Sequence, residues 1–336
     1  MTKFVTDIAV IGAGPVGLFS IFEAGMLKMK CNVIDTLDFI GGQCTALYPE
    51  KPIYDIPGHP EILASDLIEK LSKQAEPFKP IYHLGQRVEK LQKTNGKFLL
   101  TTSKNTLIEA NSIIIAAGCG AFGPNRPPTN NIEAYEGKTV LYMVNEREKF
   151  RNKRVVIAGG GDSAIDWAIS LSEITEYIYL VHRRPKFRCA PENLNKINQL
   201  VSDKKIEMVV PYQLEEIEGD GSIISSVIVK DFDNNLRSLR ADYLLPFFGL
   251  SMELGPIAEW GLNINHNHID VDNSTMQTSS EGIYAIGDII NYPGKLKLIL
   301  SGFAEAAIAT YSIYPRVHPN EALHFEYSTT KGIIAA

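Results

Sequence analysis

The chain has 336 residues, with 33 Lys and Arg against 39 Asp and Glu and a formal net charge of −6. Its 45% apolar and 21% charged content is typical of a globular protein, and this length allows two domains. The negative balance disfavours nucleic acid as a partner, and no apolar stretch approaches the roughly 20 residues of a membrane span. We therefore expect a globular protein with no nucleic-acid partner and no place in a membrane.

Four cysteines are spread along the chain, at Cys31, Cys44, Cys119 and Cys189. None belongs to a C-x-x-C pair, which favours free thiols in a reducing compartment and no metal site. The N-terminal residues run almost directly into a glycine-rich motif, which leaves no room for a cleaved signal. These features predict a cytoplasmic protein without a bound metal.

The first part of the chain, residues 4–35, reads as strand, glycine-rich turn, helix and strand. Its apolar run 7–11 is typical of a buried parallel strand. An irregular stretch rich in Gly and Pro follows at 39–61, of the kind that shapes ligand contacts. We predict a helix over 64–78 and then alternating strands that end in a strongly apolar one at 113–117.

A cluster of breaker residues at 118–128 predicts a crossing out of this first domain. Residues 153–181 repeat the strand–turn–helix–strand plan, and strands with turns follow over about 207–240. Residues 244–252 read as the crossing back, and a short strand at 283–286 precedes a long helix. The internal repeat predicts that a second domain is inserted into the first.

The predicted fold class is therefore α/β, with two Rossmann-like domains of the three-layer ββα type. We expect a discontinuous first domain over residues 1–117 and 247–336, and a second domain over residues 118–246.

The first glycine-rich turn, IAVIGAGPVG, has the dinucleotide-binding spacing of Gly12, Gly14 and Gly17, with Pro15 inside it. These glycines permit a tight turn and a close approach of the backbone to a pyrophosphate at the helix N-terminus. Asp35 follows Gly17 by 18 residues, at the end of the next apolar run. Because an acid there can accept hydrogen bonds from a ribose diol, this half is predicted to bind a flavin or NAD-type dinucleotide.

The second turn, VVIAGGGDSA, repeats the fingerprint with Gly159, Gly161, Asp162, Ser163 and Ala164. At the place of the acid stands His182, with Arg183, Arg184 and, further on, Arg188. Arginine forks phosphate oxygens and stacks on flat rings, so this cluster favours the 2′-phosphate of NADP. A solvated basic surface is the alternative interpretation of the same residues.

A third motif, TSSEGIYAIGDII at 278–290, places Gly287 and Asp288 directly after a short strand. Asp288 can bond a sugar or ribityl hydroxyl there. An ordinary turn aspartate is the alternative, and the fingerprint in the same chain favours the ligand.

Over residues 4–332 the chain resembles the thioredoxin reductase group, in which the first domain holds FAD and the second NADPH. The redox-active C-x-x-C of that group lies about 14 residues before the second fingerprint, where this chain has Tyr142 and Asn145. The missing dithiol removes the relay from flavin to a protein disulfide and argues against a disulfide reductase.

Four motifs resemble the branch of that group without a dithiol, the bacterial ferredoxin/flavodoxin–NADP(+) reductases. They are GGQCTALYPEK (41–51), DIPG (55–58), GGGDSA with HRR, and the tail FEYSTTKG (325–332). The resemblance implies a thioredoxin-reductase-like fold, one FAD per subunit, NADP(H), and ferredoxin or flavodoxin as the electron partner. It also implies a homodimer in which the tail covers the partner subunit's flavin.

Individual roles follow from the resemblance. Asp35 would bond the adenosine ribose of FAD, Val88 the adenine through its backbone, and Asp288 the ribityl or pyrophosphate region. Gln43 and Tyr48 would lie along the flavin, with Tyr48 stacked on the isoalloxazine, and Phe122 would pack near FAD. Tyr327 would cover the other flavin face, with Thr329 near the polar edge of the ring. The catalytic residues implied are thus the two stacking tyrosines, and no acid–base side chain is assigned.

The resemblance implies hydride transfer from NADPH to flavin N5, followed by single-electron transfer to the protein partner. Because ferredoxins are acidic, a basic docking face is expected, with Lys51, Lys295, Lys297 and Lys331 as candidates, although a scattered solvated set is an equal alternative. Two other functions stay open: an NAD(P)H oxidase or diaphorase, and a flavin-binding redox sensor without turnover.

Overall fold

The computed structural model describes residues 3–323 and 327–332. The chain divides into two compact units, of which unit 1 is residues 1–122 and 252–336 and unit 2 is residues 123–251. The chain passes between them in β9 (Ala121–Pro124) and β17 (Leu250–Glu253), which pair with each other. The structure therefore gives boundaries that lie a few residues later than the expected 117/118 and 246/247.

Unit 1 is built on a sheet whose neighbouring strands run in the order β5-β2-β1-β8-β7-β6, with β20 also paired to β8. The strands are β1 (Lys3–Ile11), β2 (Cys31–Ile34), β5 (Ile81–His83), β6 (Val88–Thr94), β7 (Lys97–Thr102), β8 (Leu107–Ile115) and β20 (Ile283–Ala285). Strands β5, β2, β1, β8 and β20 pair in parallel, whereas β6, β7 and β8 pair antiparallel. Residues 8–11 of β1 are buried, as expected of a central parallel strand.

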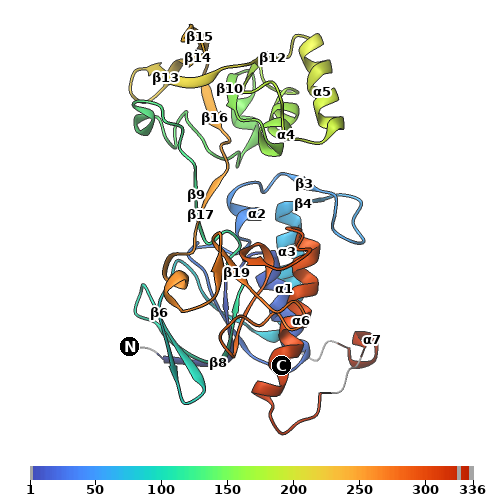
Figure 1. Ribbon diagram of the computed structural model, residues 1–336. Helices are drawn as coiled ribbons and strands as arrows, with labels where there is room; N and C mark the ends of the chain where they lie inside the picture. The colour runs from blue at the N-terminus through green and yellow to red at the C-terminus, as the bar shows by residue number, and fades with distance from the viewer. Residues whose placement is uncertain (1–2, 324–326, 333–336) are drawn as a thin grey trace. The chain divides into compact units, whose positions relative to one another are not determined.

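Three helices stand side by side along this sheet, α1 (Pro15–Met26), α3 (Ala64–Ala75) and α6 (Ile299–Val317) (Figure 1). Helix α3 ends before the predicted position 78, because Pro77 has no N–H to continue it and a 3₁₀ turn, η1 (Glu76–Phe78), follows. The remaining elements of unit 1 are short: α2 (Gln43–Ala46), β3 (Pro52–Ile53), β4 (Ile62–Leu63), η4 (Gly255–Glu259), β18 (Ile264–Asn265), β19 (His268–Asp270), η5 (Gly287–Ile289), β21 (Ile290–Asn291) and α7 (Ser328–Lys331).

The pairing of β20 with the end of β8 matters for the site. Ile283 aligns with Ile113 and Ala285 with Ile115, and the Ile286 N–H then donates to the Ile115 carbonyl. This pairing brings the Gly287–Asp288 turn to the sheet edge at which β1 and β8 also end. Ligands of open α/β sheets bind at this carboxyl edge.

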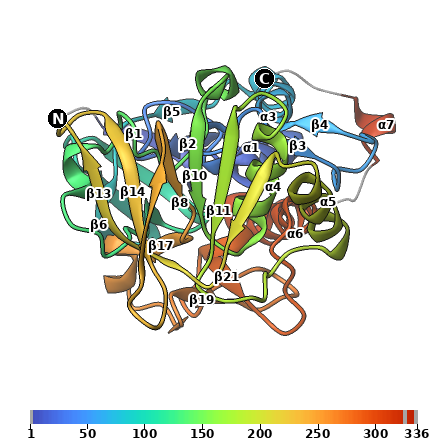
Figure 2. The ribbon, with the colours of Figure 1, turned by 90° about the horizontal axis from the view of Figure 1, so that it is seen from above.

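Unit 2 has a parallel sheet in the order β12-β11-β10-β16 and an antiparallel sheet in the order β13-β14-β15. Figure 2 shows β10 beside β11, and β13 beside β14. Its elements are η2 (Ile132–Ala134), η3 (Arg147–Phe150), β10 (Arg154–Ala158), α4 (Asp162–Leu171), β11 (Tyr177–Val181), α5 (Pro191–Ser202), β12 (Ile206–Val209), β13 (Gln213–Gly219), β14 (Ile224–Lys230), β15 (Leu236–Arg240) and β16 (Tyr243–Pro246).

Each unit thus repeats a strand–turn–helix–strand motif on a parallel sheet, β1–α1–β2 in unit 1 and β10–α4–β11 in unit 2. The predicted α/β class with two Rossmann-like repeats is confirmed. Within the described part of the chain, no helix combines the length and apolarity that crossing a bilayer requires.

Candidate dinucleotide sites

A cavity in unit 1 lies at the carboxyl edge of its sheet and has about 1320 Å³ of space, part of it open to solvent. Eight of the predicted site residues line it: Gly12, Gly14, Pro15, Asp35, Gln43, Tyr48, Val88 and Asp288. These residues come from five separate parts of the chain, and the fold brings them to one place.

The three glycines of the first fingerprint have different structural roles. Gly12 has a φ of +109°, and a Cβ on it would lie 2.3 Å from the Ala116 carbonyl oxygen. A Cβ on Gly17 would lie 2.1 Å from the Gly12 carbonyl oxygen, so Gly17 packs the helix against the turn and does not line the cavity. Around Gly14, which caps α1, the space is open, and the first turn of α1 has no acidic residue. This bare, acid-free helix N-terminus fits a pyrophosphate.

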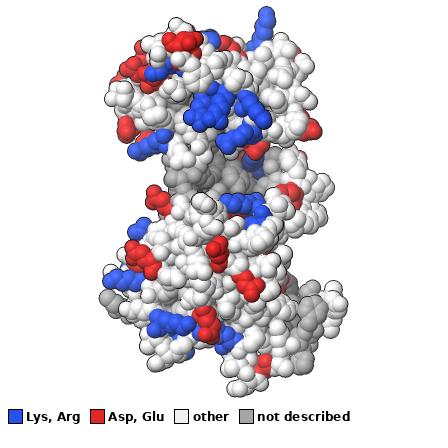
Figure 3. Space-filling model, in the orientation of Figure 1, with Lys and Arg blue, Asp and Glu red and all other residues white. Residues whose placement is uncertain are grey.

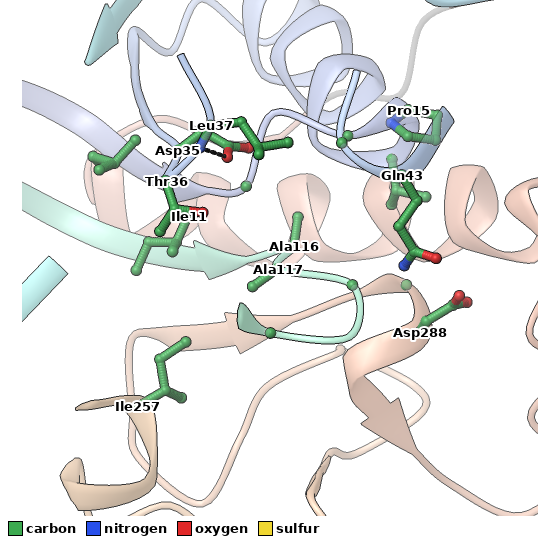
Figure 4. A pocket seen from close by; sticks show the side chains of 18 of the residues that line it. Ile11, Pro15, Asp35, Thr36, Leu37, Gln43, Ala116, Ala117, Ile257 and Asp288 are labelled. Carbon is green, nitrogen blue, oxygen red and sulfur yellow. Dashed lines mark hydrogen bonds between the residues drawn. The ribbon is translucent and has the colours of Figure 1, made fainter. Parts of the chain in front are cut away.

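Asp35 lies at one end of the cavity, beside Leu37 (Figure 4). Its carboxylate accepts the Ala13 N–H at 2.6 Å and the Leu37 N–H at 2.9 Å. Burial raises the pKa of Asp35, and these two hydrogen bonds oppose that rise. Because each carboxylate oxygen has a further lone pair, Asp35 can hold the fingerprint turn and still accept a ribose hydroxyl.

The other end of the cavity carries Gln43 and Asp288, whose side chains are seen close by in Figure 4. The Gln43 amide donates to the Cys119 sulfur at 3.4 Å, and the Cys44 thiol to the Tyr48 hydroxyl at 3.7 Å. Burial raises the pKa of Cys44 to about 11 and raises that of Tyr48 as well. At neutral pH the thiol and the phenol are therefore uncharged, which suits the apolar face of a flavin ring.

Several lining residues were not predicted. They include Gln86, Arg87, Gly118, Gly120, the segment 254–257, and Leu298 and Ile299. Gly118 and Gly120 lie a few residues after the end of β8 and have φ values of +57° and +71°, so a glycine pair after a buried strand was an available signal. The other segments reach the cavity only through long-range folding and carry no local motif.

In unit 2 the second fingerprint has the same form. A Cβ on Gly161, which caps α4, would meet open space, whereas Gly159 packs against the Phe247 carbonyl. Asp162 and Ser163 are exposed in the first turn of α4, and Ala164 is buried beneath it. The Arg188 N–H donates to the Gly160 carbonyl at 2.7 Å, which holds the basic segment against the turn.

The arginines of this segment are available to a ligand. Arg183, Arg184 and Arg188 are exposed, and no carboxylate among the described residues pairs with them. Figure 3 shows Lys and Arg side chains gathered on one face of unit 2. An anion-binding surface beside a dinucleotide fingerprint fits a phosphorylated ribose.

His182 is half-buried, unlike the exposed arginines that follow it. Its ring fills the space in front of Gly160, where an added Cβ would lie 2.2 Å from Nε2, and stands 5.1 Å from the Phe187 ring. Burial lowers the pKa of His182, and the neighbouring arginines lower it further. His182 therefore shapes the turn as a neutral ring, and the arginines supply the positive charge.

Some predicted residues do not reach the cavity of their own chain. Tyr327 is 68% exposed and Thr329 is exposed on α7. The structure does not describe the side chains of Phe122 and Lys331. The first two residues of the predicted tail motif, Phe325 and Glu326, also lie outside the described residues.

Lys295 was wrongly assigned to a docking face. Its side chain is 4% exposed because it forms an ion pair with the equally buried Glu305. Lys297 is exposed, lines the cavity and hydrogen-bonds to His268 at 2.7 Å, and Lys51 is half-buried.

Comparison with known proteins decides the family. The pyridine nucleotide-disulphide oxidoreductase family profile matches residues 6–309. The chain belongs to this family. A ferredoxin–NADP reductase of Rickettsia felis is 60% identical over 326 residues, 97% of each chain, and that of Rickettsia prowazekii is 58% identical over 97% of this chain and 98% of its own.

Among solved structures, a thioredoxin reductase of T. acidophilum superposes with a TM-score of 0.80 at 26% identity, over 92% of this chain and 98% of its own. A thioredoxin reductase of Lactococcus lactis superposes with a TM-score of 0.78 at 23% identity, over 94% and 99%. The predicted thioredoxin-reductase-like fold and the resemblance to ferredoxin–NADP reductases are confirmed.

Proposed function

We propose that this protein is a flavoprotein oxidoreductase that transfers electrons between NADPH and ferredoxin or flavodoxin through FAD. The observation that carries the proposal is the 60% identity to a ferredoxin–NADP reductase over 97% of both chains. The two dinucleotide fingerprints of the chain supply the two nucleotide sites that such an activity needs.

In this proposal unit 1 is the FAD domain and unit 2 the NADPH domain. The cavity would hold FAD with its adenosine ribose at Asp35, its pyrophosphate at the N-terminus of α1, and its flavin end near Gln43, Tyr48 and Asp288. In unit 2, the N-terminus of α4 would take the NADPH pyrophosphate, and Arg183 and Arg184 the 2′-phosphate.

When bound, FAD supplies the chemistry, since a flavin accepts a hydride and passes electrons on singly. The protein binds and orients it. The Tyr48 phenol and the Cys44 thiol are neutral at this end of the cavity, so the Asp288 carboxylate is the acidic group there. No side chain in this scheme has to move a proton.

The partners belong to the same proposal. We propose a homodimer in which Tyr327 and Thr329 of one subunit cover the flavin of the other, because both are exposed in their own chain. Lys297 and Lys51 remain the candidates for contact with an acidic ferredoxin or with a flavodoxin. A cytoplasmic location is proposed from the four free, separate cysteines.

Two other functions would use the same sites. An NAD(P)H diaphorase would pass electrons to oxygen or quinones, and a sensor would bind FAD without fast turnover. A disulfide reductase is disfavoured, since Tyr142 donates a hydrogen bond to Glu136 at 2.7 Å at the place of its redox cysteine.

A steady-state assay tests the proposal. The purified yellow protein with NADPH should reduce cytochrome c at a rate that depends on added ferredoxin or flavodoxin. A rate that neither carrier increases, with oxygen or quinone consumed instead, would favour the diaphorase. Bound FAD with no NADPH oxidation would favour the sensor.

A further inference from the structure

A buried ionic network lies directly behind the cavity turn that carries Asp288. Glu305 on α6 and Lys295 in the loop before it form an ion pair with side chains 3% and 4% exposed. Glu305 Oε1 also accepts the Tyr292 hydroxyl at 2.8 Å, and Oε2 accepts the Gly287 N–H at 2.8 Å. One carboxylate on α6 thus accepts from three donors, all within residues 287–295.

Stability alone does not account for such a network. Taking two charges out of water is costly, so a buried ion pair adds little net stability, and the geometry that it fixes has to be considered. Glu305 and Lys295 are not among the described residues that line the cavity, so they act on a ligand there only through other groups. Burial raises the pKa of Tyr292 to about 12, which keeps its hydroxyl a donor.

The group that the network fixes is the turn itself. Gly287 has a φ of +81°, and Asp288 is the next residue. On the strand side, Ile286 is held by β8 through its hydrogen bond to Ile115. On the helix side, the Glu305 carboxylate holds the Gly287 N–H.

Helix α6 comes close enough to do this because of Gly302, one turn before Glu305. A Cβ on Gly302 would lie 2.3 Å from Val16 at the start of α1. The bare helix face therefore lets α6 approach α1, and Glu305 reaches beneath the turn.

We propose that Glu305 is a positioning residue for the cofactor: it fixes the Gly287 N–H so that the Asp288 carboxylate faces the cavity, while Lys295 and Tyr292 hold the Glu305 carboxylate in place. The inference rests on the proposed function, since FAD is the ligand whose hydroxyls Asp288 would meet.

Two double variants separate this role from simple loss of a buried charge. Both replace the lysine by Met, which removes the ammonium that a single Glu305 variant would leave unpaired. Glu305→Gln with Lys295→Met keeps an acceptor for the Gly287 N–H, whereas Glu305→Leu with Lys295→Met keeps the volume and removes the acceptor.

The readout is the dissociation constant of FAD, measured by flavin fluorescence on apoprotein stripped of its flavin. The Gln variant should bind FAD within about threefold of wild type, and the Leu variant about tenfold more weakly, because it leaves the N–H unpaired. Equal dissociation constants for the two double variants would overturn the proposal.

A second readout needs no cofactor. Amide hydrogen exchange of the peptide 283–291 in the apoprotein should be faster in the Leu variant than in the Gln variant, and equal exchange would count against the positioning role. If the wild-type protein failed to bind FAD, the proposed function would be wrong. Amide hydrogen exchange would even then show whether Glu305 holds the Gly287 turn in place.

Arg316→Gln is the matched control on α6. Arg316 anchors the far end of the helix, through hydrogen bonds to the Asn111 carbonyl at 2.8 Å and to Glu281 at 3.0 Å. This variant should lower the melting temperature and leave FAD affinity unchanged. A loss of FAD affinity equal to that of the Leu variant would show that general weakening of α6, and not Glu305, sets the affinity.

Discussion

Single residues at the two candidate nucleotide sites have more than one role, and Asp35 is the clearest case. It lies where a ribose-binding acid is expected, and it also accepts two backbone N–H groups of its own unit. Its neighbour on the next strand, His83, accepts the Asp35 N–H with its carbonyl at 3.2 Å. His83 is 5% exposed, and its ring Nε2 lies 2.7 Å from the Asn32 side-chain oxygen.

His83 gives a prediction about pH. Burial lowers its pKa in the folded state, so between the folded value and the unfolded value of about 6.5 the unfolded chain binds more protons. The stability linked to His83 is therefore complete above about pH 6.5 and is lost as the pH falls towards the folded pKa. When the pH falls from about 7.5 to about 5.5, the melting temperature of the wild type should fall further than that of His83→Gln. Equal falls would contradict the lowered pKa of His83 in the folded state.

The arginines of unit 2 predict nucleotide preference. Replacing Arg183 and Arg184 together by Ala should weaken NADPH binding about 10- to 100-fold, because charged hydrogen bonds to the 2′-phosphate are lost. NADH binding should change little. Arg154→Ala removes an exposed ion pair with Glu176 in the same unit and is the control. Isothermal titration with both nucleotides checks the result, and equal weakening of NADH would contradict 2′-phosphate recognition.

At the scale of elements, the local motifs could be predicted from the sequence and their long-range partners could not. The motifs β1–α1–β2 and β10–α4–β11 are specified by glycine spacing and by apolar runs over about 30 residues, and the structure contains both motifs. The burial of Lys295 could not be predicted from the sequence, because it depends on which face of α6 packs beneath Gly287 and so where Glu305 lies. The packing of the His182 ring against Gly160 likewise depends on tertiary contact.

The tail is the element whose role is still a prediction. Tyr327 is 68% exposed in its own chain, and we expect its ring to cover a flavin in a partner subunit. Tyr327→Ser should change the rates of electron transfer more than the FAD content, because the cavity of the same chain does not include this residue. Stopped-flow rates and flavin absorbance check this, and unchanged rates would contradict the covering role.

At the scale of the whole molecule, two units with dinucleotide fingerprints are joined in one chain that has no C-x-x-C pair. The four cysteines are free, and Tyr142 and Asn145 stand where disulfide reductases have their redox pair. Electrons entering from NADPH at unit 2 and held at unit 1 would therefore leave directly to a separate carrier protein. This separates the proposed activity from that of the thioredoxin reductases, whose fold it shares.

Anaerobic stopped-flow with sequential mixing tests this central claim most directly. The purified protein is mixed first with NADPH, or with NADH for comparison, and then with oxidised ferredoxin, while flavin and ferredoxin absorbance are followed. We expect fast flavin bleaching by NADPH, slower bleaching by NADH, and rapid recovery of flavin absorbance as ferredoxin is reduced. Bleached flavin that neither ferredoxin nor flavodoxin reoxidises would contradict it.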